Sequence, residues 1–273
     1  MPKKFFWCVF YVILMMPLTG CERNPSIGLG PLVTPLGHHE TTWSLVPGSG
    51  FQIQFTGKID LSVEAAVFEL DAFDTPATTI EQLHQKGSLT ICYINAGAFE
   101  DWRPDACQYP ESVIGKDYAG WPGESWLDIR QLDVLKPILE ARLDVCLAKG
   151  FDAVEFDNVD GWQNDTGFEI SSQDQLAYNK ALAEAAHVRG LAAGLKNDPD
   201  HMAELEDWFD FAVVESCFSQ GWCEQTSPFL NAGKAVFVIE YVPIEQYCQE
   251  SKNLSISLIQ KRRSLDSWRK NCE

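Results

Sequence analysis

Short apolar runs alternate with longer segments of helical periodicity along most of this chain. The runs that predict β-strands cover residues 51–55, 65–70, 89–94, 151–156, 191–195, 211–214, 234–239 and 255–259. The segments that predict helices cover residues 78–85, 132–149, 172–189, 202–209 and 265–270. Strands that alternate with helices form parallel sheets, and eight of them fit a closed barrel. We therefore predict an α/β fold with a single (β/α)8 (TIM) barrel domain over residues 43–273, with an open doubly wound sheet as the alternative.

Polar residues follow these apolar runs, most abruptly in the stretch GFDAVEFDNVDGW from Gly150 to Trp162. In a parallel barrel, all such strand ends share one rim around a central pocket. Carboxylates that converge there cannot all be ionised, so their pKa values are expected to split, as an acid and a nucleophile or base require. Two carboxylates of this kind cleave glycosidic bonds. The residues at these strand ends are Asp71, Asn95, Asp157, Lys196, Glu215 and Glu240.

Other chemistries leave weaker signals in this sequence. A Mg²⁺ or Ca²⁺ site built from the same acids is the main chemical alternative, and it includes a metal-dependent hydrolase or esterase. Acid-rich and Asn-rich turns also occur where they only cap the next helix. The sequence shows no GxGxxG or P-loop pattern, no GxSxG, no evident Ser-His-Asp pattern and no CxxC pair. We therefore expect no cofactor and no bound metal.

The first 42 residues read as export and tethering segments rather than as part of the fold. Lys3 and Lys4 precede an apolar run over residues 5–16 that is too short to span a bilayer. The following Leu-Thr-Gly-Cys run resembles the lipobox of bacterial lipoproteins, in which the cysteine, here Cys21, is lipidated. We predict a signal peptide over residues 1–20, a Pro- and Gly-rich tether over 21–42, and a lipid-anchored protein of the bacterial cell envelope, with the outer membrane favoured. An ordinary cleaved secretory signal is the alternative.

Charge and cysteine content fit an exported protein. The net charge of −18 argues against nucleic-acid binding and would favour a cationic partner, and we expect a monomer. Export to an oxidising compartment favours disulfides. Among the seven cysteines after Cys21, we predict the pairs Cys217–Cys223 and Cys248–Cys272. Cys92–Cys107 is possible, and Cys146, in a helical pattern, is expected to be a buried free thiol.

A long segment over residues 98–130, rich in Gly, Pro and Trp, is too long to be only a connector. Such loops usually serve function. Arg103 and Asp105 are expected to pair and so to hold the loop. Trp121 and Trp126 are either sugar platforms or the core of the loop, and the sequence leaves both open.

Six runs in order resemble glycoside hydrolase family 114, and the similarity extends from Trp43 to Cys272. The runs are ICYINAGAFEDWRPDA, GWPGESWLDIR, GFDAVEFDNVDGW, GLKND, AVVESCF and VFVIEYV. This resemblance implies a (β/α)8 barrel and the activity of an endo-α-1,4-polygalactosaminidase, a hydrolase of galactosamine-containing polysaccharide. It implies that Asp157 is the nucleophile and Glu215 the general acid/base. Positions implied to line the subsites are Asp71, Tyr93, Asn95, Trp126, Asp128, Asp160, Lys196, Glu240 and Tyr241.

Several assignments keep a structural alternative. The family often has Glu-Gln-Cys where this chain has Glu215-Ser216-Cys217, which puts the hydrogen bonding beside the acid in doubt. Asp160 could only brace its turn, and Lys196 could only neutralise a neighbouring acid. Glu155 is read as structural and is expected to point away from Asp157. The alternative function is a non-catalytic polysaccharide-binding lipoprotein on the same barrel.

Overall fold

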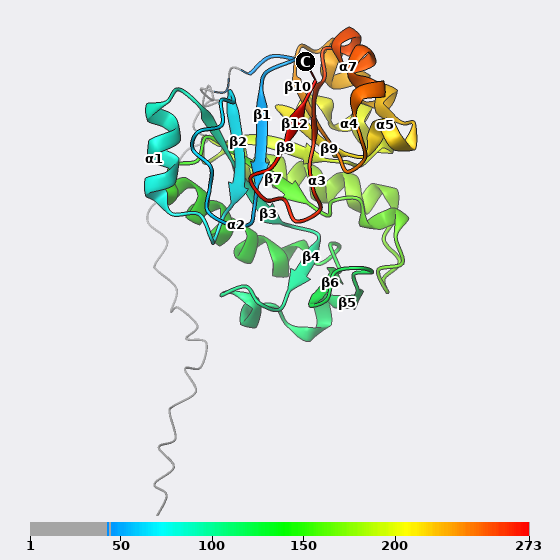
Figure 1. Ribbon diagram of the computed structural model, residues 1–273. Helices are drawn as coiled ribbons and strands as arrows, with labels where there is room; N and C mark the ends of the chain where they lie inside the picture. The colour runs from blue at the N-terminus through cyan, green and yellow to red at the C-terminus, as the bar shows by residue number, and fades with distance from the viewer. Residues whose placement is uncertain (1–42, 44, 273) are drawn as a thin grey trace, which may run out of the picture. The chain divides into compact units, whose positions relative to one another are not determined.

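Nine strands form one sheet whose spatial order follows the chain. The computed structural model describes residue 43 and residues 45–272 (Figure 1). Eight strands pair in parallel, and the last is antiparallel to its neighbour. In order they are β1 (Phe51–Gln54), β2 (Val67–Asp71), β3 (Leu89–Asn95), β7 (Ala153–Asp157), β8 (Ala192–Lys196), β9 (Phe211–Glu215), β10 (Ala235–Glu240), β11 (Ser257–Gln260) and β12 (Lys270–Asn271). The α/β class and the eight predicted parallel strands are confirmed.

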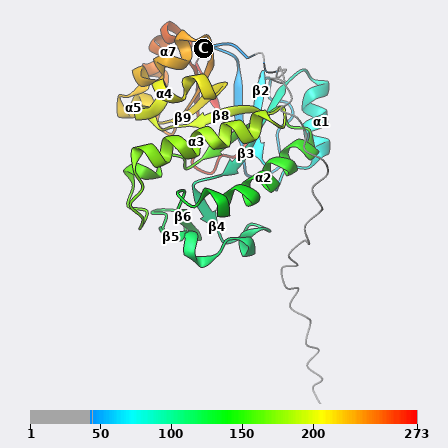
Figure 2. The ribbon, with the colours of Figure 1, turned by 180° about the vertical axis from the view of Figure 1, so that it is seen from behind.

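Helices follow most of the strands. They are α1 (Ala77–Gln85), α2 (Leu132–Lys149), α3 (Ser172–His187), α4 (Met202–Leu205), α5 (Cys217–Gln220), α6 (Ser227–Asn231) and α7 (Cys248–Leu254). Four of them (α1 to α4) lie in segments where the sequence predicts a helix, whereas α5, α6 and α7 are not predicted. Helix α2 ends at Gly150, whose φ of 89° suits glycine at a helix C-terminus. A capping box at Ser171 begins α3. Helices α2 and α3 pack side by side (Figure 2). No helix in the described ranges is long and apolar enough to cross a membrane.

The sheet has an apolar layer on each face, because successive side chains of a buried strand point to opposite sides. On β2, Phe68 and Leu70 pack in the outer layer, against the helices. Val67 packs in the inner layer, together with Phe51, Phe211 and other strand residues. The polar residues at the strand ends therefore lie above an apolar plug that fills the concave side of the sheet.

The C-terminal segment follows a path that the sequence does not predict. The helix expected over residues 265–270 is wrong, since the segment is extended and ends in β12. Leu265 has a φ of 45°, and Asp266 accepts hydrogen bonds from Ser264 Oγ and Trp268 N, which favours a turn over a helix. The segment instead contacts β1 and the residue after it: Gln52 Nε2 donates to Ser267 O at 3.2 Å, and Phe55 N donates to Leu265 O at 2.9 Å. The sheet is curled, because the distant strands β1 and β11 lie in contact, although no ladder joins them among the described strands. The C-terminal segment lies along this seam.

A second, smaller sheet lies within the long loop over residues 98–130. It consists of β4 (Ala98–Glu100), β5 (Ile114–Asp117) and β6 (Glu124–Leu127), paired antiparallel in the order β4-β6-β5. The strands are only three or four residues long, which is too short for a periodic pattern to predict them from the sequence. This sheet gives the loop a fixed shape at the end of β3.

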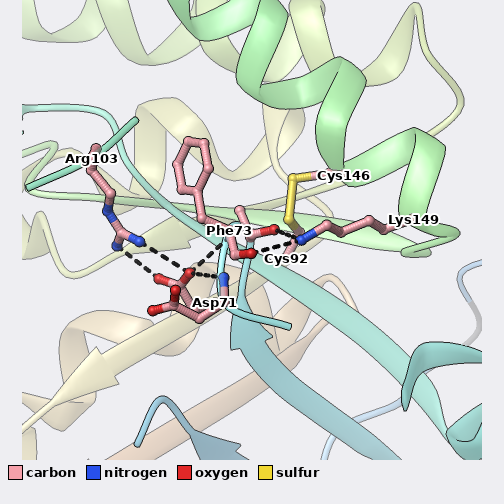
Figure 3. The surroundings of a disulfide bond; sticks show 8 residues. Asp71, Phe73, Cys92, Arg103, Cys146 and Lys149 are labelled. Atoms are coloured by element: carbon pink, nitrogen blue, oxygen red, sulfur yellow. Dashed lines mark hydrogen bonds and ion pairs between the residues drawn. A yellow bond between two sulfur atoms is a disulfide. The ribbon is translucent and has the colours of Figure 1, made fainter. Parts of the chain in front are cut away.

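Buried arginines hold this loop, but not through the predicted Arg103–Asp105 pair. Arg103 binds both carboxylate oxygens of Asp71, at 3.0 and 2.7 Å, and also contacts Glu100 (Figure 3). Asp105 pairs instead with Arg142 of α2, at 2.7 Å. The expected pair is wrong because each side chain finds a partner from another element, which sequence proximity does not reveal.

Three disulfides join described cysteines. Cys217–Cys223 and Cys248–Cys272 confirm the two preferred pairs. The third joins Cys92 of β3 to Cys146 of α2, so the possible Cys92–Cys107 pair and the free thiol at Cys146 are both wrong (Figure 3). Cys146 is buried, as expected, and the packing of α2 on the sheet brings it to β3. Cys21, with the predicted signal peptide and tether, lies outside the described residues.

Candidate active site

Three neighbouring strands end in charged residues that meet above the inner apolar layer. Asp157 ends β7, Lys196 ends β8 and Glu215 ends β9. The Lys196 ammonium lies 3.0 Å from Asp157 Oδ1 and 3.8 Å from Glu215 Oε1. Lys196 is only 5% exposed, whereas both carboxylates are partly exposed. The two acids therefore share one buried cation and keep a face open to solvent.

Left-handed residues follow all three of these strand ends. Asn158, Asn197 and Ser216 have φ values of 61°, 47° and 60°, a region that residues other than glycine seldom occupy. Asn158 N donates to Asp157 Oδ1, and Asn197 Oδ1 accepts from Glu215 N, each at 2.9 Å. These sharp turns fix the carboxyl groups at the rim. Local strain of this kind is common at functional sites.

Each acid also has its own tyrosine. Tyr93 donates its hydroxyl proton to Asp157 Oδ2 at 2.8 Å, and Tyr241 donates to Glu215 Oε1 at 2.6 Å. Burial raises the pKa of both phenols, and the adjacent carboxylate raises each further. Both tyrosines therefore stay protonated near neutral pH and act as fixed hydrogen-bond donors.

The side chain of Glu155 does not point away from Asp157, so the expectation from the sequence is wrong. Side chains alternate with a period of two along a strand, so Glu155 points to the same side as Asp157, not away from it. It is fully buried on the inner face of β7, and Lys196 Nζ lies 3.4 Å from Glu155 Oε1. Burial raises the pKa of Glu155 to about 8.

The small sheet of the long loop forms a wall beside these acids. Trp126 is buried, and its ring lies 4.5 Å from the ring of Tyr118, whereas Trp121 is 48% exposed. Glu124 accepts a hydrogen bond from Asn95 Nδ2 at 3.1 Å. Burial, helped by Glu100 and Asp157, raises the pKa of Glu124 to about 7. The wall thus adds an aromatic pair and a titrating carboxyl group to the rim.

Tight packing and further acids complete the rim around Asp157. A Cβ at Gly97 would lie 1.6 Å from the carbonyl oxygen of Asn158, so only glycine lets the end of β3 approach this turn. Burial raises the pKa of Asp160 to about 6, and Asp198 and Asp157 add to the shift.

Three residues that the family resemblance implies are engaged in contacts of their own. Asp71 is paired with Arg103, and Asp128 with Arg130 at 2.7 Å. Glu240 is fully buried and accepts hydrogen bonds from the backbone N–H groups of residues 218 and 219 at the start of α5. In this structure these carboxylates anchor neighbouring segments, and their contact with substrate stays a prediction.

A buried chain of hydrogen bonds, which the sequence does not reveal, lies behind the turns after β7 and β8. Ser172 Oγ lies 2.7 Å from His201 Nε2, and His201 Nδ1 lies 3.0 Å from Asp198 Oδ2. The Asp198 carboxylate also accepts from Trp162 Nε1 and Asn179 Nδ2. These hydrogen bonds link the segment after β7 to α3 and to the turn after β8. Within the described ranges, no group of His, Cys, Asp and Glu is arranged to hold a metal ion.

The curled parallel sheet and the paired carboxylates at one rim define a glycosidase-like site on a barrel-type fold. The model of glycoside hydrolase family GH114 matches residues 34–273, and the chain belongs to this family of glycoside hydrolases. Aspergillus fumigatus Ega3, solved in complex with galactosamine, is 32% identical, with a TM-score of 0.79 over 86% of this chain and 100% of that chain.

Two further matches extend the comparison. The glycoside hydrolase domain of PelA from Pseudomonas aeruginosa shares the fold at 14% identity, with a TM-score of 0.66 over 82% of this chain and 98% of that chain. An uncharacterized protein of Deinococcus radiodurans is 26% identical over 84% of this chain and 86% of its own length.

Proposed function

We propose that this glycoside hydrolase cleaves α-1,4-linked galactosamine-containing polysaccharide within the chain, with retention of configuration. The observation that carries the proposal is the pair of partly exposed carboxylates on one buried ammonium. Because Lys196 Nζ contacts Asp157 Oδ1 and Glu215 Oε1, these oxygens are separated by at most the sum of 3.0 and 3.8 Å. Retaining enzymes place their carboxyl groups about 5–5.5 Å apart and inverting enzymes about 6.5–9.5 Å apart, so this bound admits the retaining distance and excludes all but the lower end of the inverting range.

The contacts of Asp157 fit the role of nucleophile, and the family resemblance gives Glu215 the role of general acid/base. Asp157 accepts hydrogen bonds from the Tyr93 hydroxyl, the Lys196 ammonium and the backbone N–H of Asn158, which hold its carboxyl group in place for attack. In the first step Asp157 forms a bond to the anomeric carbon, while Glu215 gives its proton to the leaving oxygen. In the second step Glu215 takes a proton from water, and the water oxygen displaces Asp157.

The charge of the site supports a cationic substrate. The rim near Asp157 carries Glu124 and Asp160 as further acids, and the chain has a net charge of −18. A deacetylated galactosamine polymer carries ammonium groups that these carboxylates would attract. The galactosamine bound in the Ega3 structure, at 32% identity, supports the same substrate class for this chain.

Degradation of defined polymers tests the proposal. Purified protein is incubated with deacetylated and N-acetylated α-1,4-galactosamine polymers. Product sizing separates endo from exo cleavage, and NMR of the newly released anomer reports retention or inversion. Asp157→Asn and Glu215→Gln are expected to lower turnover at least about a thousandfold with the fold intact, and the exposed Asp165→Asn is the matched control. Binding without cleavage by the wild type would instead establish a polysaccharide-binding protein.

Three further parts of this picture are proposals of the same kind. The sheet is proposed to form a closed barrel, and hydrogen bonds between the C-terminal segment and the chain at β1 support this, such as the one that Phe55 N, just after β1, donates to Leu265 O. The mature chain is proposed to be a monomer. It is proposed to be anchored through Cys21 in the bacterial cell envelope, with the outer membrane favoured, and the lipobox-like run supports this.

A further inference from the structure

The Lys196 ammonium meets three carboxyl groups, and the two catalytic acids account for only two of them. Its distances are 3.0 Å to Asp157 Oδ1, 3.4 Å to Glu155 Oε1 and 3.8 Å to Glu215 Oε1. An ammonium group carries three N–H donors. Asp157 and Glu215 approach from the open rim, since both are partly exposed, whereas Glu155 is fully buried on the inner face of the same strand as Asp157.

Glu155 has no other visible purpose in the packing. Neither of its oxygens has a hydrogen-bond partner among the described residues, and its contact with Lys196 is an ion pair at 3.4 Å. A second buried acid on the inner face, Glu69 of β2, is likewise without a hydrogen-bond partner in that range. Burying an acid in this way costs stability, and an apolar side chain of similar size would suit the fold better. Sequences break this rule mainly where function needs it.

We propose that Glu155 is a positioning residue of this active site, whose carboxyl group is the third ion-pair contact that holds the Lys196 ammonium between Asp157 and Glu215. The inference rests on the proposed function for its kinetic consequence, but its geometric content does not. Without this contact the ammonium is free to move, and neither its hydrogen bond to Asp157 Oδ1 nor its charge beside Glu215 Oε1 stays in place. Charge stabilisation at a preorganised site depends on that fixed geometry.

When Glu155 is ionised, its carboxylate competes with Asp157 and Glu215 for the Lys196 ammonium. The titratable groups that face it are Glu69 from β2, Tyr93 from β3, Asp157 from β7, Lys196 from β8 and Glu215 from β9. Burial raises the pKa of Glu155 to about 8, so the group is mostly protonated at neutral pH. As the pH rises through this value, Glu155 ionises and attracts the ammonium away from the rim, and turnover should fall.

Two substitutions at this position separate positioning from bulk packing. Glu155→Met removes the acceptor at similar volume, and it should lower kcat about tenfold or more while KM changes little. Glu155→Gln keeps a carbonyl acceptor without the ionisable group. It should regain part of the lost turnover and move the alkaline limb of the kcat profile to higher pH. Thermal unfolding of Glu155→Met should be unchanged or shifted upward, and the exposed Glu81→Met on α1 is the control.

A measurement without substrate tests the geometry itself. In ¹⁵N-lysine-labelled protein, the ammonium of Lys196 should give a protected NMR signal that is absent in Lys196→Met. This signal should be lost or broadened in Glu155→Met and retained in Glu81→Met. An unchanged signal, or a kcat of Glu155→Met within twofold of wild type, would overturn the inference. If the wild type cleaves no galactosamine polymer, the proposed function fails, and the NMR result alone decides on Glu155. If Glu155→Met does not fold, Glu155→Gln replaces it, and an unshifted alkaline limb would be the contrary result.

Discussion

Substitution of Glu124 by glutamine should stabilise the protein increasingly as the pH rises. Glu124 is 8% exposed, and burial together with Glu100 and Asp157 raises its pKa from 4.5 to about 7. An acid with a raised folded-state pKa must hold its proton in the folded state at pH values where the unfolded chain has released it. Stability is therefore lost as the pH rises from the unfolded pKa to the folded one. Glu124→Gln removes this loss and keeps an oxygen that can accept from Asn95 Nδ2.

The magnitude follows from the two pKa values. One pKa unit corresponds to about 1.4 kcal/mol. The ionisation penalty of Glu124 is then about 1 kcal/mol at pH 5 and about 3 kcal/mol at pH 8. The stability of Glu124→Gln relative to wild type should thus improve by about 2 kcal/mol between these pH values. Any constant effect of the amide cancels in that difference.

Denaturant unfolding at pH 5 and pH 8, followed by fluorescence and circular dichroism, measures this change. Glu111→Gln serves as control, because Glu111 lies on the same long loop but is exposed, and its effect should be equal at both pH values. If the gap between Glu124→Gln and wild type is also equal at pH 5 and pH 8, the carboxyl group does not titrate as its burial requires, and the reasoning is wrong.

Three further changes have expected outcomes. Tyr241→Phe removes the 2.6 Å hydrogen bond to Glu215 and should lower kcat about 10- to 100-fold at similar KM, which steady-state kinetics would show; an unchanged kcat would contradict it. Replacing Cys92 and Cys146 together by serine opens a bridge with a sequence separation of 54 and should cost about 4 kcal/mol in denaturant unfolding, a loss that a change below about 1 kcal/mol would refute. Cys21→Ser should release the protein from membrane fractions, and continued sedimentation with membranes would exclude a lipid anchor at this residue.

The sequence by itself determined the parallel sheet and the strand ends that carry the acids. Buried parallel strands are short apolar runs, and alternation with helices implies their order, so β7, β8 and β9 were predicted to within about two residues. Asp157, Lys196 and Glu215 follow such runs directly, and parallel strands bring their C-terminal ends to one rim. The apolar runs and the parallel direction of the strands were therefore sufficient to place these three residues together. The family resemblance added their roles.

Only the tertiary structure decided the partners of the individual side chains. Arg103 pairs with Asp71, and Cys146 with Cys92, because separate elements meet there, and no local pattern records such meetings. The small sheet that places Glu124 beside Asn95 arises from strands too short to show a period. The third contact of Lys196, with Glu155, depends on the register in which β7 pairs with β8. Local periodicity predicts which face of an element a side chain lies on, whereas the side chain that it contacts on another element depends on how the elements pack.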